Sequence, residues 1–338
     1  MSEVTAIPEP ATVPTAARRG RGRRLLRLVA LMLVTLFLVV TLASLVYNLA
    51  TRGRAEPAMS LYGGPFVMVD GHRVAYRSWG ASGSPVVLLG GFVVPSGVWG
   101  PVGTLLGRDH RVVAIDMPPF GYSERRGPYT LAGWVALLQK TERALGIERP
   151  VVVGHSLGAA TAVASALADP AGVQGIVLLD GDALAGGNGW AARLALEPYV
   201  TSAYRLLAGW DWLFRRLLTT GYGRPGVRAS DADVSEWQRP FRVEGTQAGL
   251  LSLARQGIVG LRLEDLRRVR TPSLVVWGAD DSFDSVAAGR ASARALRAPF
   301  VLIPRAGHLS MVVAPAAVAR SVERVARGSS SVANGAPG

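Results

Sequence analysis

Hydrophobic positions along the chain form one long apolar segment and a series of much shorter apolar runs. The long segment covers residues 28–50, contains no charged side chain and is dominated by Leu and Val. Twenty-three helical residues at about 1.5 Å each are long enough to cross a hydrocarbon core of ~30 Å. The pattern therefore predicts a membrane-spanning helix near the start of the chain.

The short apolar runs are rich in Val, Ile and Leu and predict β-strands. They cover residues 66–69, 72–77, 85–89, 111–115, 150–153, 173–179, 273–277 and 299–303. Asp70-Gly71 separates the first two runs and is typical of a two-residue hairpin turn. Helical patterns over 130–145 and 314–327 lie between or after the later strands. Strands that alternate with helices predict an α/β fold with a mostly parallel sheet and helices on both faces.

Composition shifts mark the expected domain boundaries. We expect residues 1–27 to be a disordered basic tail, 51–60 a linker and 61–327 a single globular domain. A long insertion, about 182–268, interrupts the strand pattern and predicts a helical cap. Residues 328–338 are small and polar and predict a second disordered tail.

The arginines around the apolar segment are distributed unevenly. Six precede it, at positions 18, 19, 21, 23, 24 and 27, and two follow it, at positions 52 and 54. This asymmetry predicts a single-pass cell-membrane protein with a cytoplasmic N-terminus and residues 55 onward outside. A cleaved signal peptide is the alternative, but its apolar region is normally only ~7–15 residues long. Asn48-Leu49-Ala50 is also a poor cleavage site, so we interpret residues 28–50 as an uncleaved signal anchor.

The net charge of +13 suggests a nucleic-acid partner at first sight, but its distribution argues against one. Residues 1–54 hold eight arginines against Glu3 and Glu9, which leaves +7 spread over the remainder without a dense basic run. We therefore expect a solvated surface and no nucleic acid. The chain contains no cysteine, which excludes disulfides and thiolate metal sites. No phosphate-binding glycine loop, metal cluster or dinucleotide motif is present, so we expect no cofactor and no metal.

The most informative motif is Gly154-His155-Ser156-Leu157-Gly158. It follows the predicted strand at 150–153 and precedes a run of small residues that predicts the start of a helix. A Gly-x-Ser-x-Gly at a tight strand-to-helix turn exposes the serine hydroxyl on a strained backbone. A Cβ at either glycine would collide with a neighbouring strand or helix. We predict that Ser156 is a nucleophile.

A serine hydroxyl needs a base to remove its proton, and the chain has four histidines. His72 lies in the predicted hairpin, His110 precedes a strand at the opposite end from the motif, and the side chain of His155 points away from Ser156. His308 follows the last predicted strand, where a loop returns over the same edge of the sheet. It is our candidate base, although a plain surface-loop histidine is the alternative interpretation.

A carboxylate should orient the imidazole and stabilise its charged form. Asp281 lies three residues after Gly278, at the end of the penultimate predicted strand, and is our candidate. Asp280 is interpreted as a turn or capping residue. Asp180 and Asp182, which follow an earlier strand, are reserve candidates because an acid there could also reach His308.

From about residue 61 to 327 the chain resembles the α/β-hydrolase-fold family. The matching segments are Gly154 to Gly158, Gly278 to Asp281, Gly307-His308, and Asp116 to Ser123. The last resembles the family's Asp-x-x-Gly-x-Gly-x-Ser loop, with Pro119 in place of a glycine. Where the family typically has His-Gly-x, this chain has Gly90-Gly91-Phe92. The resemblance implies an oxyanion hole made by the backbone N–H groups of Phe92 and Leu157.

Family members with an aspartate nucleophile open epoxides or displace halides, whereas a serine favours acyl transfer to water. We therefore predict a serine hydrolase that cleaves a small to medium hydrophobic ester through an acyl-enzyme. A C–C bond hydrolase or an acyltransferase would use the same triad, and a catalytically silent binding protein would keep the fold.

The insertion at 182–268 contains many aromatic residues, including half of the chain's eight tryptophans. They either line an apolar pocket or form the core of the cap itself. The segment from Tyr204 to Leu218 is a candidate for resting on a membrane surface.

Overall fold

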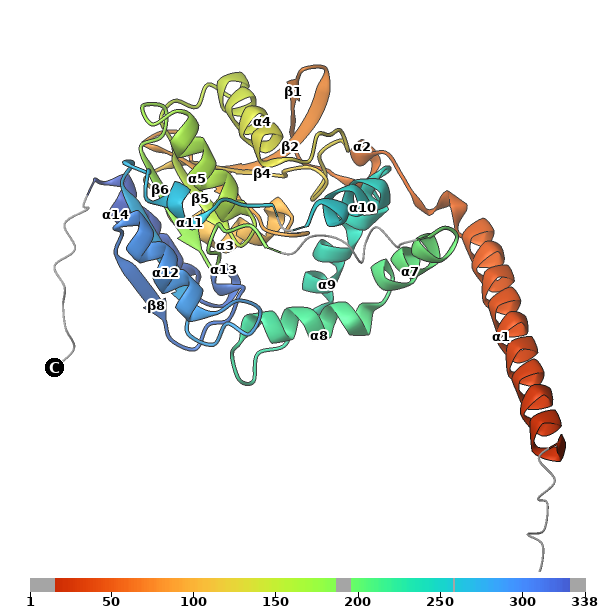
Figure 1. Cartoon of the computed structure of the whole chain (residues 1–338). Helices are drawn as coiled ribbons and strands as arrows, with labels where there is room; N and C mark the ends of the chain where they lie inside the picture. Colours follow the sequence, from red (N-terminus) through yellow and green to blue (C-terminus); the bar gives the residue numbers. More distant parts are fainter. Residues whose placement is uncertain (1–15, 187–195, 258, 329–338) are drawn as a thin grey trace, which may run out of the picture.

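The fold is built on an eight-stranded sheet, and the computed structural model describes residues 16–186, 196–257 and 259–328 of the chain (Figure 1). The strands are β1 Phe66–Val69, β2 His72–Trp79, β3 Pro85–Leu89, β4 Arg111–Ile115, β5 Val151–His155, β6 Gly175–Leu179, β7 Ser273–Gly278 and β8 Phe300–Ile303. Their order across the sheet is β1-β2-β4-β3-β5-β6-β7-β8. β2 pairs with β1 and β4 in antiparallel fashion, and all the other pairs are parallel. The predicted mostly parallel sheet is confirmed.

Helices cover both faces of this sheet and bury its central strands. One face packs against α4 Leu131–Ala144, α5 Gly158–Ala168 and α12 Val286–Leu296, and the other against α3 Gly100–Leu106 and α14 Pro315–Ala326. Strands that are buried on both faces read as continuous apolar runs, which is why these strands stand out in the sequence. The predicted helices at 130–145 and 314–327 correspond to α4 and α14 to within one residue at each end.

The hairpin at the edge of the sheet follows the Asp-Gly turn signal. Asp70 and Gly71 have φ angles of 49° and 76°, and Val69 pairs with His72 on either side of them. Two successive positive φ angles define the type I′ turn that suits the twist of paired strands. The predicted hairpin is therefore present, and β2 continues to Trp79.

A helical cap connects β6 to β7, as the long insertion predicts. It contains α7 Tyr199–Ala208, α8 Asp211–Tyr222, α9 Asp231–Gln238, η3 Arg239–Arg242, α10 Thr246–Gln256 and α11 Leu263–Leu266. Its two ends meet where the N–H of Ala185 donates to the carbonyl of Leu261 (3.0 Å) and the N–H of Leu261 donates to that of Ala183 (3.0 Å). In Figure 1, α8 and α9 lie below the sheet, α7 lies beside the upper end of α1, and α11 lies near α12.

The N-terminal helix α1, Ala16–Ala50, is longer than the apolar segment and leaves the globular part (Figure 1). It includes residues 16–27, which we expected to be disordered. Ala and Arg are good helix formers, and an existing helix extends more easily than a new one nucleates. From Arg24 to Ala50 the helix is long and apolar enough to cross a membrane, and its apolar window is not buried in the protein. The rest of the predicted N-terminal tail, 1–15, and most of the C-terminal one, 329–338, lie outside the described residues.

The segment predicted as a linker, 51–60, is folded against the cap. It contains η1 Arg52–Arg54 and the start of α2 Ala58–Leu61. The N–H of Glu56 donates to the carbonyl of Arg242 (2.8 Å), and the N–H of Glu244 donates back to the carbonyl of Glu56 (2.9 Å). The backbone pairs here as in a sheet, which the polar composition of the segment did not indicate.

Candidate active site

Ser156 lies at the sharp turn between β5 and α5. Its φ angle is 49°, in the left-handed region that residues with a side chain rarely adopt. Its N–H donates to the carbonyl of Leu179 (2.9 Å), and its own carbonyl accepts from Ala159 (2.9 Å). These backbone bonds on both sides hold the strained residue in place and leave its side chain at the edge of the sheet.

The two glycines of the motif allow the turn to close. A Cβ on Gly154 would lie 2.3 Å from the carbonyl oxygen of Gly158, and a Cβ on Gly158 would lie 2.7 Å from that of Gly90. Both contacts are with backbone atoms, which cannot rotate away as a side chain can. This is the collision that the motif predicts.

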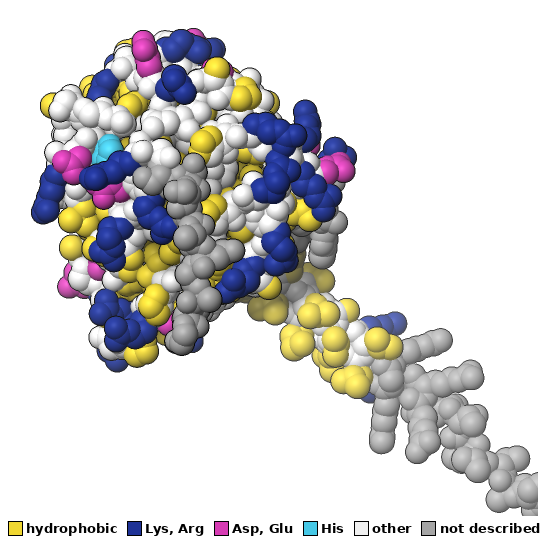
Figure 2. Space-filling view, turned by 90° about the vertical axis from the view of Figure 1, so that its left-hand side faces the viewer, with side chains coloured by type: hydrophobic (Ala, Val, Ile, Leu, Met, Phe, Trp, Pro, Cys, Tyr) yellow, Lys and Arg dark blue, Asp and Glu magenta, His cyan; other side chains and the backbone are white. Residues whose placement is uncertain are grey.

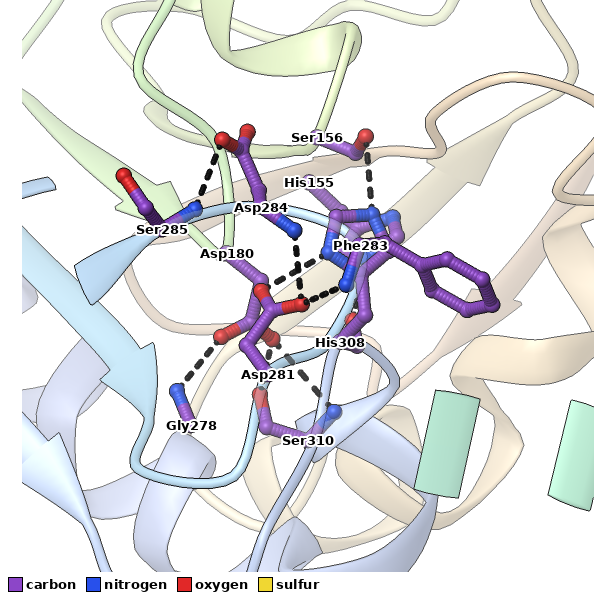
Figure 3. A network of polar contacts seen from close by, with 10 residues as sticks. All are labelled: His155, Ser156, Asp180, Gly278, Asp281, Phe283, Asp284, Ser285, His308 and Ser310. Atoms are coloured by element: carbon purple, nitrogen blue, oxygen red, sulfur yellow. Dashed lines mark hydrogen bonds and ion pairs between the residues drawn. The ribbon is translucent and has the colours of Figure 1, made fainter. Parts of the chain in front are cut away.

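The loops after β5, β7 and β8 bring Ser156, Asp281 and His308 together (Figure 3). His308 Nε2 lies 3.0 Å from the Oγ of Ser156, and His308 Nδ1 lies 2.9 Å from Oδ2 of Asp281. The side chain of Asp281 is fully buried, and that of His308 is 13% exposed. The carboxyl ends of parallel strands share one edge of the sheet, which explains how residues more than a hundred positions apart meet.

Asp281 is fixed by its own loop. Its Oδ1 accepts hydrogen bonds from the N–H groups of Phe283 (2.9 Å) and Asp284 (3.0 Å), and Oδ2 faces the imidazole. Burial alone would lower the pKa of His308, but the hydrogen bond and charge of Asp281 raise that pKa above its usual value. The imidazole is therefore held in one orientation and made a better proton acceptor.

The other acidic candidates have different partners. Asp180 is fully buried and accepts from the N–H of Gly278 (2.7 Å) and from the hydroxyl of Ser310. Burial raises the pKa of Asp180 to about 7. Asp182 accepts from the N–H of Leu184 (2.9 Å), and the N–H of Asp280 donates to Ala306 (2.9 Å). Asp180 thus ties together the two loops that carry Asp281 and His308, a role that the sequence analysis missed.

His155 has a supporting position that the motif alone did not indicate. Its Nε2 lies 2.7 Å from the backbone carbonyl of His308. Burial, followed by the nearby His308, lowers the pKa of His155 to about 3, so its ring is neutral and donates to that carbonyl. His155 therefore supports the loop of the candidate base, and within the described residues its ring makes no hydrogen bond to Ser156.

The candidate oxyanion hole lies beside Ser156, on the loop after β3. A Cβ on Gly91 would lie 2.6 Å from the Cβ of Ser156, so only a glycine lets this loop approach so closely. In the part of the chain that the structure describes, the N–H groups of Phe92 and Leu157 donate no hydrogen bond. Two unused donors next to the hydroxyl are what a developing oxyanion requires.

The segment from Asp116 to Ser123 is hydrogen-bonded to the chain that follows β3. One carboxylate oxygen of Asp116 accepts from the N–H of Ser96 (2.6 Å) and the other from that of Tyr122 (2.9 Å). The hydroxyl of Ser123 donates to the carbonyl of Asp116 and accepts from the N–H of Ala75 (2.8 Å). Burial raises the pKa of Asp116 to about 6. These hydrogen bonds hold the loop after β3, in which Gly90 stands where the family typically has a histidine.

A cavity of about 510 Å³ opens onto Ser156 and His308. Most of its wall is apolar, and its described part contains two carboxylates, Asp182 and Asp284, and no Lys or Arg. The two aromatic residues in this wall, Phe92 and Phe283, come from loops of the sheet and not from the cap. In the described part of the cap the aromatic side chains thus lie outside the cavity, and several form the core of the cap: Phe214, Tyr222 and Trp237.

No group of three His, Asp or Glu side chains that could hold a metal ion occurs within residues 16–186, 196–257 and 259–328.

The sheet order, the strained serine at the end of β5 and the loops that face it define an α/β-hydrolase fold. The chain belongs to the alpha/beta hydrolase family, whose model matches residues 86–321. The resemblance drawn from the motifs is thereby confirmed.

Relatives in this family have diverse names. An uncharacterized hydrolase of Bacillus subtilis, YugF, is 24% identical over 223 residues, which is 63% of this chain and 79% of the relative. The 2-hydroxy-6-oxo-6-(2'-aminophenyl)hexa-2,4-dienoic acid hydrolase of Metapseudomonas resinovorans is 25% identical over 77% of this chain and 90% of its own length. An uncharacterized protein of Mycobacterium tuberculosis is 32% identical over 42% of each chain.

Among solved structures, one described as a bacterial membrane phospholipase A matches with a TM-score of 0.65 at 20% identity. The match covers 92% of this chain and all of the other. At this identity the likeness concerns the fold.

We predict that Gly158→Ala destabilises the protein by about 1–3 kcal/mol, because the new Cβ would press on backbone atoms of β3 and its loop. Gly100→Ala is the matched control, since Gly100 also begins a helix and has open space around it. Thermal unfolding of the two variants checks this. Equal unfolding temperatures would contradict the packing argument.

We predict that the reactivity of Ser156 rises with pH through a pKa of His308 above 6.5, because the imidazolium below that pKa cannot accept the serine proton. Asp281→Asn removes the charge that raises this pKa. The midpoint should therefore move to lower pH, and the plateau rate should fall by about 10³-fold or more. The measurement is the rate of fluorophosphonate labelling against pH.

Asp280→Asn is the control for this experiment, because Asp280 makes no hydrogen bond or ion pair with His308 in the described part of the chain and should leave the midpoint in place. A shift with Asp280→Asn and none with Asp281→Asn would assign the role to the other acid.

Proposed function

We propose that this chain is a serine hydrolase that cleaves small to medium hydrophobic esters. The observation that carries the proposal is the continuous hydrogen-bonded line from Asp281 through His308 to the hydroxyl of Ser156. It joins a buried carboxylate, a base with a raised pKa and a serine on a strained turn. Together they meet the geometric requirements for an activated nucleophile.

The reaction proceeds in two halves. His308 accepts the proton of Ser156 as the oxygen attacks the ester carbonyl, and the N–H groups of Phe92 and Leu157 stabilise the oxyanion. The tetrahedral adduct collapses to an acyl-enzyme, and the alcohol leaves with the proton from His308. A water molecule then gives a proton to His308 and attacks the acyl-enzyme. Collapse of the second adduct releases the acid and returns the proton to Ser156.

The cavity supports a neutral, largely apolar substrate. Its volume of about 510 Å³ lies within the range of small-molecule sites, and its described wall is mainly apolar. Asp182 and Asp284 would repel an anionic group close to the nucleophile. Burial and the charge of Asp182 raise the pKa of Asp284, which reflects two acids in one confined space.

A C–C bond hydrolase is the second candidate, because relatives that hydrolyse dienoic acids align with most of this chain. Such a substrate has a carboxylate, and the described wall of the cavity contains no Lys or Arg to pair with it. The cavity therefore favours the ester. An acyltransferase would pass through the same acyl-enzyme and differ only in the acceptor.

We also propose that α1 anchors the enzyme in the cell membrane, with the hydrolase domain outside the cytoplasm. The span from Arg24 to Ala50 is long and apolar enough to cross a bilayer, and arginines are concentrated on its N-terminal side. The match to a structure described as a membrane phospholipase A extends over 92% of this chain and is consistent with an anchor.

We predict that a fluorophosphonate probe labels the full-length protein at Ser156. Ser156→Ala removes the nucleophile and His308→Ala the base, so each should abolish labelling and reduce turnover of p-nitrophenyl esters by at least about 10³-fold. Mass spectrometry of the adduct and ester assays with graded acyl chains check both points.

His110→Ala is the matched control, because His110 lies before β4, away from the cavity. Absence of labelling in a folded sample would favour a catalytically silent binding protein. Faster turnover of a dienoic acid than of any ester would favour the C–C hydrolase.

The orientation of the chain in the membrane can be tested with single introduced cysteines. The chain has no natural cysteine, so a maleimide can label only the introduced one. In intact cells a membrane-impermeant maleimide should label Ser82→Cys, an exposed position of the globular domain. Ser2→Cys should be labelled only after lysis, because it lies on the arginine-rich side of the span. The reverse pattern would overturn the proposed topology.

A further inference from the structure

A second cavity of about 770 Å³ lies where α1 joins the cap. Residues of η1, α7, α8, α9, η3 and the start of α10 form its wall. It shares no lining residue with the catalytic cavity, so it is a separate space. The proposed hydrolase mechanism makes no use of it.

The wall of this cavity is strongly basic. It contains two acids, Asp211 and Asp231, and five arginines: Arg54, Arg205, Arg215, Arg239 and Arg242. Two of the arginines are neutralised, since Arg215 pairs with Asp231 and Arg242 pairs with Glu56.

The side chains of Arg54 and Arg239 make no hydrogen bond or ion pair within the described part of the chain, although the charge of Arg239 is near enough to Glu236 to offset part of the rise in pKa that burial causes in that carboxyl. Both guanidinium groups are therefore available to an anion that enters the cavity.

Hydrogen bonds fix the position of the cavity relative to α1. Asn48 Nδ2 donates to the carbonyl of Pro198 (2.9 Å), and the Oγ of Ser202 lies 3.1 Å from Asn48 Oδ1. Arg205, itself in the wall of the cavity, donates to the carbonyl of Asn48 (2.6 Å) and to the hydroxyl of Thr51 (2.8 Å). The C-terminal end of the proposed membrane span is thus joined directly to one wall of the cavity.

An exposed apolar corner of the cap lies next to the same wall. Leu206 and Leu207 at the end of α7, and Trp210 and Trp212 at the start of α8, are between 47% and 58% exposed. They alternate with Ala208, Gly209 and Asp211, which line the cavity. Tryptophan is enriched at membrane–water interfaces. Figure 2 shows basic side chains on the globular part close to the point where the apolar α1 leaves it.

We propose that this cavity binds the anionic headgroup of a phospholipid. The phosphate pairs with Arg54 and Arg239, and the acyl chains lie along α1 and the apolar corner formed by Leu206, Leu207, Trp210 and Trp212. Guanidinium groups suit this ligand because they donate two parallel hydrogen bonds to phosphate oxygens. The proposal rests on α1 being the membrane anchor, and it is independent of the chemistry at Ser156.

The test uses the full-length protein in detergent, titrated with phosphatidylglycerol or phosphatidylcholine and observed by native mass spectrometry. We expect one phosphatidylglycerol to be retained by the wild type. In Arg54→Gln/Arg239→Gln its dissociation constant should rise at least about tenfold, which corresponds to about 1.4 kcal/mol. Arg54→Lys/Arg239→Lys keeps both charges and should recover part of the affinity.

Arg294→Gln/Arg320→Gln is the matched control, because it removes two exposed charges from α12 and α14, away from the cavity. It should leave the dissociation constant within about twofold of the wild-type value. Thermal unfolding of each variant shows whether the fold is retained.

Equal retention of phosphatidylcholine, or equal losses in both Gln double variants, would overturn the site. Displacement of the lipid by millimolar inorganic phosphate would assign the cavity to a soluble phosphate-bearing ligand and overturn the lipid source. Fluorophosphonate labelling of the same wild-type sample reports on the proposed hydrolase separately. A labelled enzyme that retains no lipid would therefore contradict this proposal alone.

Discussion

The close approach of three backbone segments around Ser156 is the constraint on which the rest of this structure depends. Gly158 packs against the carbonyl of Gly90, Gly91 packs against Ser156, and a Cβ on Gly181 would lie 2.4 Å from the carbonyl oxygen of Ser156. None of these contacts leaves room for a side chain. The tightly packed edge of the sheet thus holds Ser156 in its strained left-handed conformation.

Two fully buried carboxylates complete this edge without taking part in the proposed chemistry. Asp116 ties the loop after β3 to the segment that follows β4, and Asp180 ties the loops after β7 and β8 to each other. Burying a carboxylate is costly, and the raised pKa values of both groups show that cost. The two carboxylates offset this cost by accepting hydrogen bonds from backbone N–H groups in irregular loops, which would otherwise be buried without a partner.

The sheet, the hairpin and the three side chains of the candidate site could be predicted because each has a local signature. Buried parallel strands read as apolar runs, Asp70-Gly71 sets a turn, and the serine motif requires glycine at two fixed positions. The role of Asp180 could not be predicted, because its partners Gly278 and Ser310 lie 98 and 130 positions away and nothing in the sequence pairs them with Asp180. For the same reason the polar segment at 51–60 was predicted to be a linker, although Glu56 forms an isolated β-bridge with Val243 of the cap.

The hydrogen bonds between α1 and α7 make the apolar helix part of the cap rather than a flexible tether. Thr41, Ser44 and Asn48 face polar partners on α7, and Arg205 satisfies the carbonyl of Asn48 near the end of the helix. A shortened protein made soluble by deleting residues 1–54 would lose these partners and expose them to water. Substrate preferences measured on such a fragment would therefore describe an enzyme whose cap lacks its hydrogen bonds to α1. In the intact chain the same hydrogen bonds hold α7 of the cap against α1.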